Sequence, residues 1–257
     1  YCSGNKGIRY PVGGYVMVDI ILAGGFGKLG QAIQLGLKNT DYRIVGILSG
    51  HQHESTYPVW TTREAIDVKA DIFLDVSTPK TVFDNAKWAI AHDMLLVVGA
   101  TGLSDFEVDT LRQTATRGVL IVPNFSLSAV LLMAFAQQAA KYFPDVEIVE
   151  THNPKKVDAP SGTAIQTAKL ISEARSTTGA KTTEGPARGM RVEDIPVHAL
   201  RLPGYIAQQS VLFGGTDEQL TLTQSTTSRT AFVPGVLRAL VGVQELKGLA
   251  IGLEKVL

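Results

Sequence analysis

The chain has 257 residues, 45% hydrophobic and 19% charged, the composition of a globular protein with room for one large domain or two smaller ones. Its 24 Lys and Arg balance 24 Asp and Glu, which argues against nucleic acid or an acidic membrane as the main partner because such surfaces need a basic excess. The single cysteine, Cys2, excludes an internal disulfide framework and fits a reducing cytoplasm, and no apolar run reaches the length of a membrane span.

The first sixteen residues, YCSGNKGIRYPVGGYV, differ in character from the rest of the chain. They lack the charged and apolar regions of a signal peptide. Met17 directly precedes a strand-like run, so we expect natural translation to start there. Residues 1–16 would then be a tag or another non-native tail, and we leave them out of the fold prediction.

From Val18 to about residue 125, short apolar runs alternate with segments of helical period. The run VDIILAGG ends in glycines, and KLGQAIQLGLKN follows with Leu29, Ile33 and Leu37 on one helix face. Four more apolar runs are closed by Gly, Ser, Thr or Pro: RIVGILSG, DIFLDVST, MLLVVGATG and GVLIVPN. Amphipathic helices are predicted for PKTVFDNAKWAIAH and LSDFEVDTLRQTATR. Strands apolar on both faces and joined by helices predict an α/β domain with a doubly wound, Rossmann-type parallel sheet.

The pattern changes after this region. LSAVLLMAFAQQAAKYF predicts a long buried helix, and DVEIVETHN alternates like a half-exposed strand. A helix begins near Ser161, and the polar segment 175–194 is expected to be loop. IPVHALRLPGYIAQQSVLFG and EQLTLTQSTTS alternate with period two and predict antiparallel strands. The last segment, TAFVPGVLRALVGVQELKGLAIGLEKVL, reads as helix that returns to the first domain.

These patterns divide the chain into two expected domains. Residues 17–125 and 229–257 form the first domain. Residues 126–228 form the second, an α+β domain with an open mixed or antiparallel sheet. An open sheet leaves a face or an edge that needs cover, and association between sheets is one solution, so this second domain is the expected site of oligomerisation.

The sequence GGFGKLG places Gly24, Gly27 and Gly30 between a predicted strand and a predicted helix. The first glycine permits a tight turn, the second lets the backbone approach a pyrophosphate, and the third allows close packing of helix on strand. An ordinary turn without a ligand is the alternative. Because the strand–turn–helix context is the one that the mechanism requires, we predict a dinucleotide site.

The end of the second predicted strand, GILSGHQH, bears on the choice between NADH and NADPH. An acidic residue there would bind the ribose 2′-hydroxyl group, and an arginine would favour a 2′-phosphate. The chain has Ser49, Gly50 and His51 instead, with Lys28 as a further candidate for a phosphate, so the choice stays open. His51 and His53 form an H-x-H pair, but without convergent Cys, Asp or Glu we expect solvated histidines and no metal site.

Three other strand ends carry polar or glycine-rich sequences: DVSTP, GATG and PNFS. Any one of them alone has ordinary turn chemistry. Together they follow successive strands of one parallel sheet, and ligands bind along the carboxyl edge of such sheets. We therefore expect a nicotinamide pocket at this edge.

The stretch HNPKKVDAPSGTA gathers cations and hydroxyl groups at the start of a predicted helix. A helix N-terminus favours an anion, and the added lysines suggest a ligand with more than one carboxylate or phosphate. Ser161 and Thr163 also suit simple helix capping, which is compatible with ligand binding. Asp158 fits a turn-holding role better than a catalytic one. A serine-hydrolase site is disfavoured because APSGT is not G-x-S-x-G.

Over nearly all of residues 17–257 the sequence resembles the dihydrodipicolinate reductase (4-hydroxy-tetrahydrodipicolinate reductase) family of bacterial lysine and diaminopimelate biosynthesis. The most specific match is ETHNPKKVDAPSGTA, similar to the family signature E-x-H-H-x-x-K-x-D-A-P-S-G-T-A. GGFGKLG resembles the cofactor loop, GATG the family's G-T-T-G, and SRTAFVPG its S-R-x-x-F-x-x-G stretch. The resemblance implies a cytoplasmic oxidoreductase that uses NADH or NADPH to reduce 4-hydroxy-tetrahydrodipicolinate to tetrahydrodipicolinate, and a homotetramer.

The resemblance implies that the first domain, residues 17–125 and 229–257, binds the dinucleotide and that the second, residues 126–228, binds the substrate. It also implies roles for individual residues. Lys156 would be the general acid, with His152 as a second catalytic residue near the substrate. Ser161, Gly162 and Thr163 would hold a carboxylate of the substrate, together with His152 and Lys156. The cofactor would be bound by a larger set: Gly24, Gly27, Lys28, Leu29, Gly30, Ser49, Ser77, Gly99, Thr101, Gly102, Pro123, Asn124, Phe125, Arg229 and Phe232.

The chain departs from the family pattern at several positions. Asn153 replaces the second signature histidine, Ala100 replaces a threonine, and Ser128 stands where glycine is frequent. AQQS, at 207–210, replaces the more usual G-E-H-[TE]. Two other functions stay open: a different two-domain NAD(P)-dependent dehydrogenase of the amino-acid type, and a non-catalytic protein that senses nucleotides with the same fold.

Overall fold

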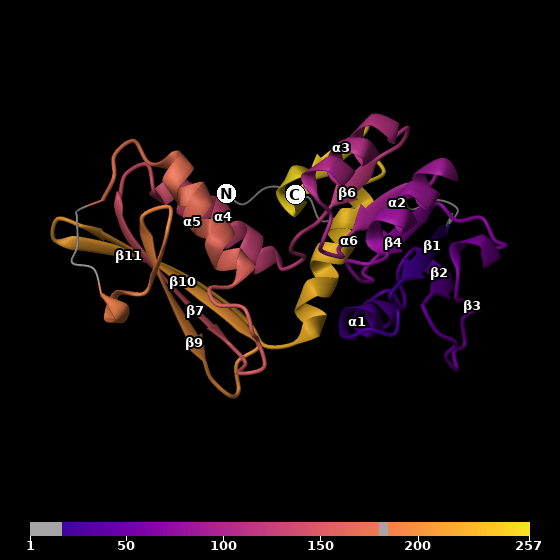
Figure 1. The fold of residues 1–257 in the computed structure, drawn as a ribbon, viewed down its shortest axis with the longest axis horizontal. Helices are drawn as coiled ribbons and strands as arrows, with labels where there is room; N and C mark the ends of the chain where they lie inside the picture. The colour runs from indigo at the N-terminus through magenta and orange to yellow at the C-terminus, as the bar shows by residue number, and fades with distance from the viewer. Residues whose placement is uncertain (1–16, 180–184) are drawn as a thin grey trace, which may run out of the picture. The chain divides into compact units, whose positions relative to one another are not determined.

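The computed structural model describes residues 17–179 and 185–257, and the expected non-native tail, 1–16, lies outside the described residues. The chain folds into two compact units (Figure 1). The first runs to Leu120 and includes Val243–Ala250. The second comprises Ile121–Gly242 and Ile251–Leu257. Among the described residues, none of the helices combines the length and the apolar character that crossing a membrane requires.

The first unit is built on a seven-stranded sheet with the order β12-β6-β5-β4-β1-β2-β3. The neighbours from β5 to β3 pair in parallel. Every residue of β4 and β5 is buried, which is why these strands read as continuous apolar runs in the sequence. The strands are β1 (Val18–Ala23), β2 (Tyr42–Leu48), β3 (Val59–Trp60), β4 (Ile72–Asp75), β5 (Leu95–Val98), β6 (Val119–Ile121) and β12 (Leu249–Ile251).

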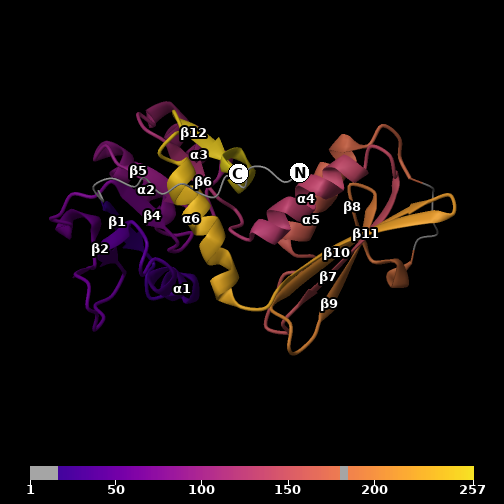
Figure 2. The same cartoon turned by 180° about the vertical axis from the view of Figure 1, so that it is seen from behind.

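Helices cover both sides of this sheet. Figures 1 and 2 show α2 (Val82–Ala91) and α3 (Asp105–Thr114) on one side and α1 (Lys28–Gly36) on the other. Helix α3 begins with a reciprocal capping box, in which Ser104 and Glu107 bond to each other's backbone N–H groups. The predicted doubly wound α/β architecture is therefore confirmed.

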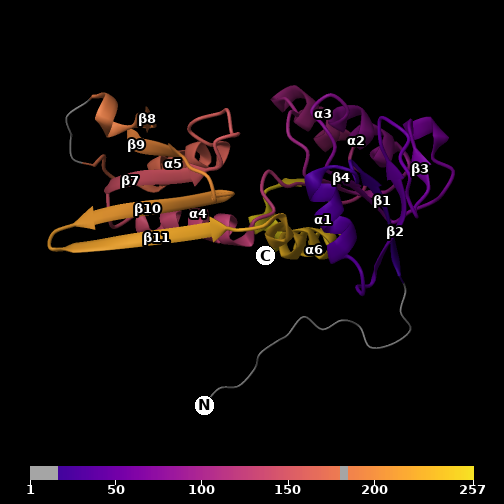
Figure 3. The same cartoon turned by 90° about the horizontal axis from the view of Figure 1, so that it is seen from below.

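The second unit contains a five-stranded sheet with the order β11-β10-β7-β9-β8. The sheet is mixed, because β9 runs parallel to β7 while the other pairs are antiparallel. Helices α4 (Leu127–Ala139) and α5 (Gly162–Ala174) pack on one face, and the opposite face is turned toward the viewer in Figure 3. The strands are β7 (Asp145–His152), β8 (Met190–Val192), β9 (Ile195–Arg201), β10 (Ala207–Gly215) and β11 (Glu218–Thr226).

Alternation along the central strand explains why this sheet has one apolar face. Val146 and Ile148 of β7 point into the core that the sheet shares with α4 and α5. Glu147 and Val149 point to the opposite face, because successive side chains of a strand alternate. We call these the inner face and the outer face of the five-stranded sheet.

Three sequence predictions are wrong in detail. The segment 175–194, expected to be loop, contains β8, a short edge strand whose mostly exposed residues give no apolar pattern. The C-terminal segment is not one helix: α6 (Val233–Gly242) is followed by β12, with positive φ angles at Gly248 and Gly252, and by a 3₁₀ turn at Leu253–Val256. Helix α4, predicted as buried, exposes Leu131 and Phe135 to 42% and 56%.

Candidate functional site

The glycine turn of the first unit is shaped by close backbone contacts. Gly24 has φ +82°, and a Cβ atom there would lie 2.6 Å from the carbonyl oxygen of Val76. A Cβ on Gly30 would lie 2.3 Å from the carbonyl oxygen of Gly24. Gly27 is the N-cap residue of α1 and offers no side-chain acceptor to the first amides of that helix. The turn thus leaves helix N–H groups free for an anion such as a pyrophosphate.

The ends of β4 and β5 are held together by a buried carboxylate. Asp75 is fully buried and accepts hydrogen bonds from the Ser77 amide and from Asn85, each at 2.8 Å. Burial raises the pKa of Asp75 despite these hydrogen bonds. The backbone carbonyl of Asp75 accepts from the Gly99 amide at 2.7 Å. The structure thus brings Gly24, Ser77 and Gly99 to neighbouring positions at one sheet edge.

Loop residues after β2 lie near the glycine turn. The ring of His53 stacks on Phe26, with 3.8 Å between the ring centroids. The amide of Ser49 donates to the carbonyl of Trp60, and the side chains of His51 and Lys28 are exposed. Within residues 17–179 and 185–257, no group of three or more His, Cys, Asp or Glu is arranged to hold a metal ion.

In the second unit, β7 ends at His152 and α5 begins at Gly162. The Ser161 side chain is buried and caps the helix by accepting from the Ala164 amide at 3.2 Å. The half-buried Thr163 hydroxyl accepts a hydrogen bond from Asn124 at 3.4 Å. Asn124, predicted on the cofactor side, therefore lies beside a residue predicted to bind the substrate.

The loop from Asn153 to Asp158 carries the predicted general acid. The Lys156 ammonium group lies 2.8 Å from both carboxylate oxygens of Asp158. The hydrogen bond from Lys156 holds the pKa of Asp158 below its usual value. Asn153, the residue in place of the second signature histidine, closes a turn: its side chain accepts from the Lys155 amide at 3.1 Å and its carbonyl from the Lys156 amide at 3.0 Å.

Sequence reasoning missed the residue that connects these elements, Glu150. It is fully buried on the inner face and accepts from His152 Nδ1 at 2.5 Å, from the Ser161 amide at 3.0 Å and from Arg201 at 2.9 Å through two nitrogens. Burial alone would raise the pKa of Glu150, but the hydrogen bonds from Arg201 and His152 outweigh it and lower the pKa. The signal was present: alternation puts Glu150 on the apolar face of β7, where a carboxylate needs partners.

The predicted cofactor residues are divided between the two units. Arg229 lies over the ring of Phe232 at 5.9 Å, and the carbonyl of Phe125 lies 1.9 Å from where a Cβ on Gly235 would be. The second unit contains these predicted residues: Pro123, Asn124, Phe125, Arg229 and Phe232. The first unit contains the others: Gly24, Gly27, Lys28, Leu29, Gly30, Ser49, Ser77, Gly99, Thr101 and Gly102.

Two family models match this chain. Residues 18–125 match the model of the N-terminus of dihydrodipicolinate reductase, and residues 128–257 match that of its C-terminus. The chain belongs to the dihydrodipicolinate reductase family. The family predicted from the sequence is therefore confirmed, and with it an oxidoreductase of lysine and diaminopimelate biosynthesis whose N-terminal domain binds a nucleotide.

Individual relatives are similar over almost the whole chain. The 4-hydroxy-tetrahydrodipicolinate reductases of Limosilactobacillus fermentum and Lactiplantibacillus plantarum are 44% and 41% identical, each over 94% of this chain and 100% of the relative. A solved structure, the dipicolinate-bound dihydrodipicolinate reductase from Paenisporosarcina sp. TG-14, is 36% identical with a TM-score of 0.85, and covers 94% of this chain and 100% of its own.

More distant structures share only the fold. The amine dehydrogenase from Mycobacterium smegmatis is 10% identical with a TM-score of 0.61, over 91% of this chain and 94% of its own. The shared fold therefore does not by itself identify the family, which rests on the sequence matches over residues 18–125 and 128–257.

Proposed function

We propose that this chain reduces 4-hydroxy-tetrahydrodipicolinate to tetrahydrodipicolinate, with the first unit holding the nucleotide and the second unit holding the dicarboxylate. The observation that carries the proposal is the placement of His152, Lys156 and the N-terminus of α5 around one turn of the second unit. Dipicolinate, which is bound in the Paenisporosarcina reductase, resembles the proposed substrate in carrying two carboxylates on a six-membered nitrogen ring, although only dipicolinate is aromatic. We place this biosynthetic enzyme in the cytoplasm.

The N-terminus of α5 provides the anion site. Ser161 caps the helix, and the amides of Gly162 and Thr163 belong to its first turn, where no intrahelical partner exists. Gly162 is exposed and no atom lies within 4 Å of where its Cβ would be, so a carboxylate can approach the backbone closely. The partial positive charge of the helix end favours such a group.

Lys156 is the proposed proton donor. The 4-hydroxyl group of the substrate leaves as water, and reduction of the resulting unsaturated cyclic imine places a hydride on one ring carbon and a proton on the next. The Lys156 ammonium group pairs with the Asp158 carboxylate, and a substrate with two carboxylates would attract the same cation. His152 lies at the end of the adjacent strand and is proposed to contact the substrate.

The test compares two neighbouring lysines. Lys156→Ala should lower kcat by roughly 10²-fold or more, because a positioned acid contributes about 10²–10⁴-fold, while nucleotide affinity stays nearly unchanged. Lys155→Ala removes a charge from the same loop and serves as the matched control, with a much smaller effect on kcat. An unchanged rate in Lys156→Ala would show that another group donates the proton.

The glycine turn fits a dinucleotide cofactor. The contacts at Gly24 and Gly30 leave no space for larger side chains, and the exposed Gly27 allows close approach to the start of α1. The reduced nicotinamide supplies the hydride when it is bound. Gly99, Thr101 and the residues around them are proposed to face the nicotinamide, and Gly24 to Gly30 the pyrophosphate.

We propose that the chain accepts both NADH and NADPH. Residues 49–53 contain no carboxylate to repel a 2′-phosphate, and the exposed Lys28 and His51 lie on the segments that flank the site. Initial rates with the two cofactors test this proposal directly. Lys28→Ala should lower kcat/KM for NADPH more than for NADH, whereas equal losses would remove Lys28 from phosphate recognition.

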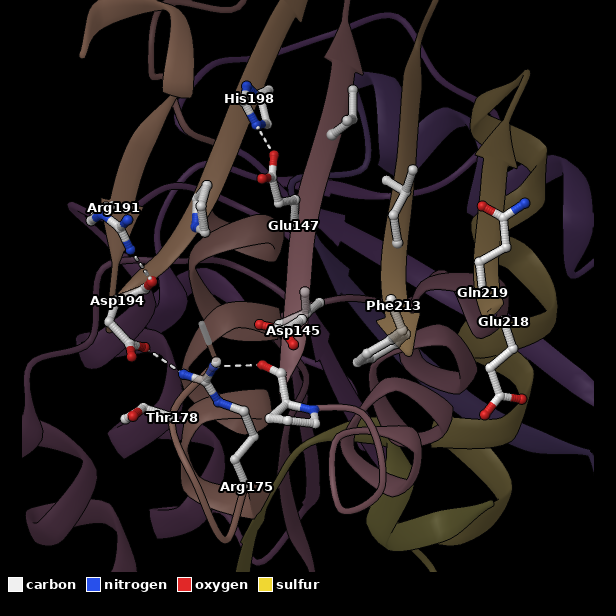
Figure 4. Close-up of a pocket in the computed structure, with 17 residues that line it drawn as sticks. Asp145, Glu147, Arg175, Thr178, Arg191, Asp194, His198, Phe213, Glu218 and Gln219 are labelled. Atoms are coloured by element: carbon white, nitrogen blue, oxygen red, sulfur yellow. Dashed lines mark hydrogen bonds and ion pairs between the residues drawn. The ribbon is translucent and has the colours of Figure 1, made fainter. Parts of the chain in front are cut away.

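The outer face of the five-stranded sheet is the proposed surface for a homotetramer. It bears a hollow of about 1030 Å³, lined by Glu147, His198, Arg175 and their neighbours (Figure 4). Leu200 and Leu212 are 43% and 41% exposed, which favours cover by another copy. Leu212→Asp should shift the sedimenting species from tetramer to smaller forms. Phe106→Asp, at an exposed position on α3, is the control and should not.

A further inference from the structure

The Glu150 carboxylate is surrounded only by donors. One oxygen accepts from His152 Nδ1 and one nitrogen of Arg201, and the other accepts from the Ser161 amide and the second Arg201 nitrogen. An ionised carboxylate has about four acceptor positions, so these four bonds fill its capacity. A glutamine would present one acceptor oxygen and an NH₂ group, which would face N–H groups. The site therefore requires a carboxylate.

This arrangement determines which nitrogen of His152 carries a proton. The pKa of Glu150 lies below its usual value, so the carboxylate is ionised at neutral pH and can only accept. His152 Nδ1 must then be the donor in the 2.5 Å contact. Among the described residues, no hydrogen bond uses His152 Nε2, and that nitrogen is left to a ligand.

Arg201 connects the same carboxylate to the lysine loop. His152 and Arg201 are register partners on the parallel strands β7 and β9. Besides its two bonds to Glu150, the guanidinium group donates to the Asp158 carbonyl at 2.7 Å. Asp158 in turn pairs with Lys156 through its side chain. One guanidinium thus fixes both the residue that orients His152 and the loop that carries Lys156.

We propose that Glu150 and Arg201 are positioning residues of the reductase: Glu150 fixes the tautomer and direction of His152 and the entry into α5, and Arg201 fixes Glu150 and the Lys156 loop. Neither residue needs to touch the substrate. The inference rests on the proposed function, because it assigns the support for the same substrate site. It also gives a reason for a carboxylate and a guanidinium on the face that packs against α4 and α5.

The test uses Glu150→Gln, which keeps the side chain's shape and removes its second acceptor. Nitrogen-15 spectra of the imidazoles, recorded on the full chain, report which ring nitrogen of His152 is protonated. We expect Nδ1–H in the wild type and a mixed or Nε2–H tautomer in the variant. We also expect kcat to fall about 10²-fold, at the lower end of what a positioned acid or base supplies, with KM changed much less.

Glu147→Gln is the matched control, because Glu147 lies on the same strand and also holds a histidine, His198, but on the outer face. It should change the His198 signals and leave those of His152 as they are. Arg201→Lys is the second variant and keeps the charge while losing the forked contact. Arg201→Lys should lower kcat about tenfold, which is less than the effect of Glu150→Gln. In this variant, His152 should keep its proton on Nδ1.

Two results would overturn the proposal. One is a folded Glu150→Gln protein in which His152 keeps Nδ1–H and kcat is that of the wild type. The other is Arg201→Lys with wild-type kcat, which would remove Arg201 from the positioning role. The spectra need no turnover, so a failure of the proposed reaction would appear separately, as a wild-type protein that is inactive with the substrate but has the expected His152 tautomer.

Discussion

On each face of the five-stranded sheet, a glutamate of β7 pairs with one histidine and one arginine. On the inner face, Glu150 binds His152 and Arg201, and on the outer face Glu147 binds His198 and Arg188. Glu150 is fully buried, whereas the Glu147 side chain is 33% exposed. The comparison shows that identical residue types acquire different roles through burial, because in the single chain water reaches the Glu147 carboxylate and not the Glu150 carboxylate.

The largest difference between the inner and outer groups should be the loss of stability when each carboxylate is removed. Glu150→Ala leaves a largely buried guanidinium and imidazole without their acceptor, so we expect a loss of about 3 kcal/mol in the free energy of unfolding. Glu147→Ala should cost about 1 kcal/mol or less, as for other exposed ion pairs. Urea unfolding at neutral pH measures both. Equal losses would mean that burial does not distinguish the two faces.

The second largest difference should be in how acid lowers the stability of the fold. Protonation of Glu150 should cost more stability than protonation of Glu147. The folded-state pKa of Glu150 lies below its ordinary value of 4.5, so its contribution to stability is present above that value and is lost as the pH falls through the folded pKa. From about pH 6 to about pH 3, wild-type protein should therefore lose more stability than Glu150→Gln.

Glu147, with its partners His198 and Arg188, provides the comparison for this measurement of stability against pH. Its pKa is also lowered, since the hydrogen bonds from His198 and Arg188 outweigh the effect of burial. Because it is more exposed, Glu147→Gln should flatten the acid limb of the stability curve less than Glu150→Gln. Identical acid limbs in all three proteins would contradict the assignment of the pKa shifts to these carboxylates.

The smallest expected difference is in how salt changes the coupling energy of the two ion pairs. A double-mutant cycle on Glu147 and Arg188 should yield a coupling of roughly 0.2–1 kcal/mol at low ionic strength. In about 1 M salt, where the screening length is near 3 Å, this coupling should fall toward zero. The coupling between Glu150 and Arg201 should fall less, because solvent ions do not reach the fully buried Glu150 carboxylate. A salt-sensitive inner pair would indicate that water penetrates the site.

Much of the architecture was predictable because local patterns encode it. The continuous apolar runs of β4 and β5 indicate strands buried on both faces, and GGFGKLG stands where a strand turns into a helix. Elements with weak local signals were missed. The short strand β3 and the exposed edge strand β8 have no extended apolar pattern, and β12 was read as helix because its segment follows α6 without an obvious break.

The candidate site also has a part that local sequence indicates and a part that it does not. The motif around His152, Lys156 and Ser161 is local, so residue order alone indicated an anion site at a helix start. Arg201 lies 51 positions from Glu150 in the chain and follows no recognisable motif. Only the parallel pairing of β9 with β7 brings its guanidinium to the carboxylate.

The sequence by itself determined the family, the two-part organisation and the helix-start motif, because each depends on residues within a few turns of one another. The tertiary structure decided which ionic group is buried, since that depends on which face of β7 receives α4 and α5. A carboxylate on that face has no water to replace a lost partner, and its strength as a support for His152 follows from this.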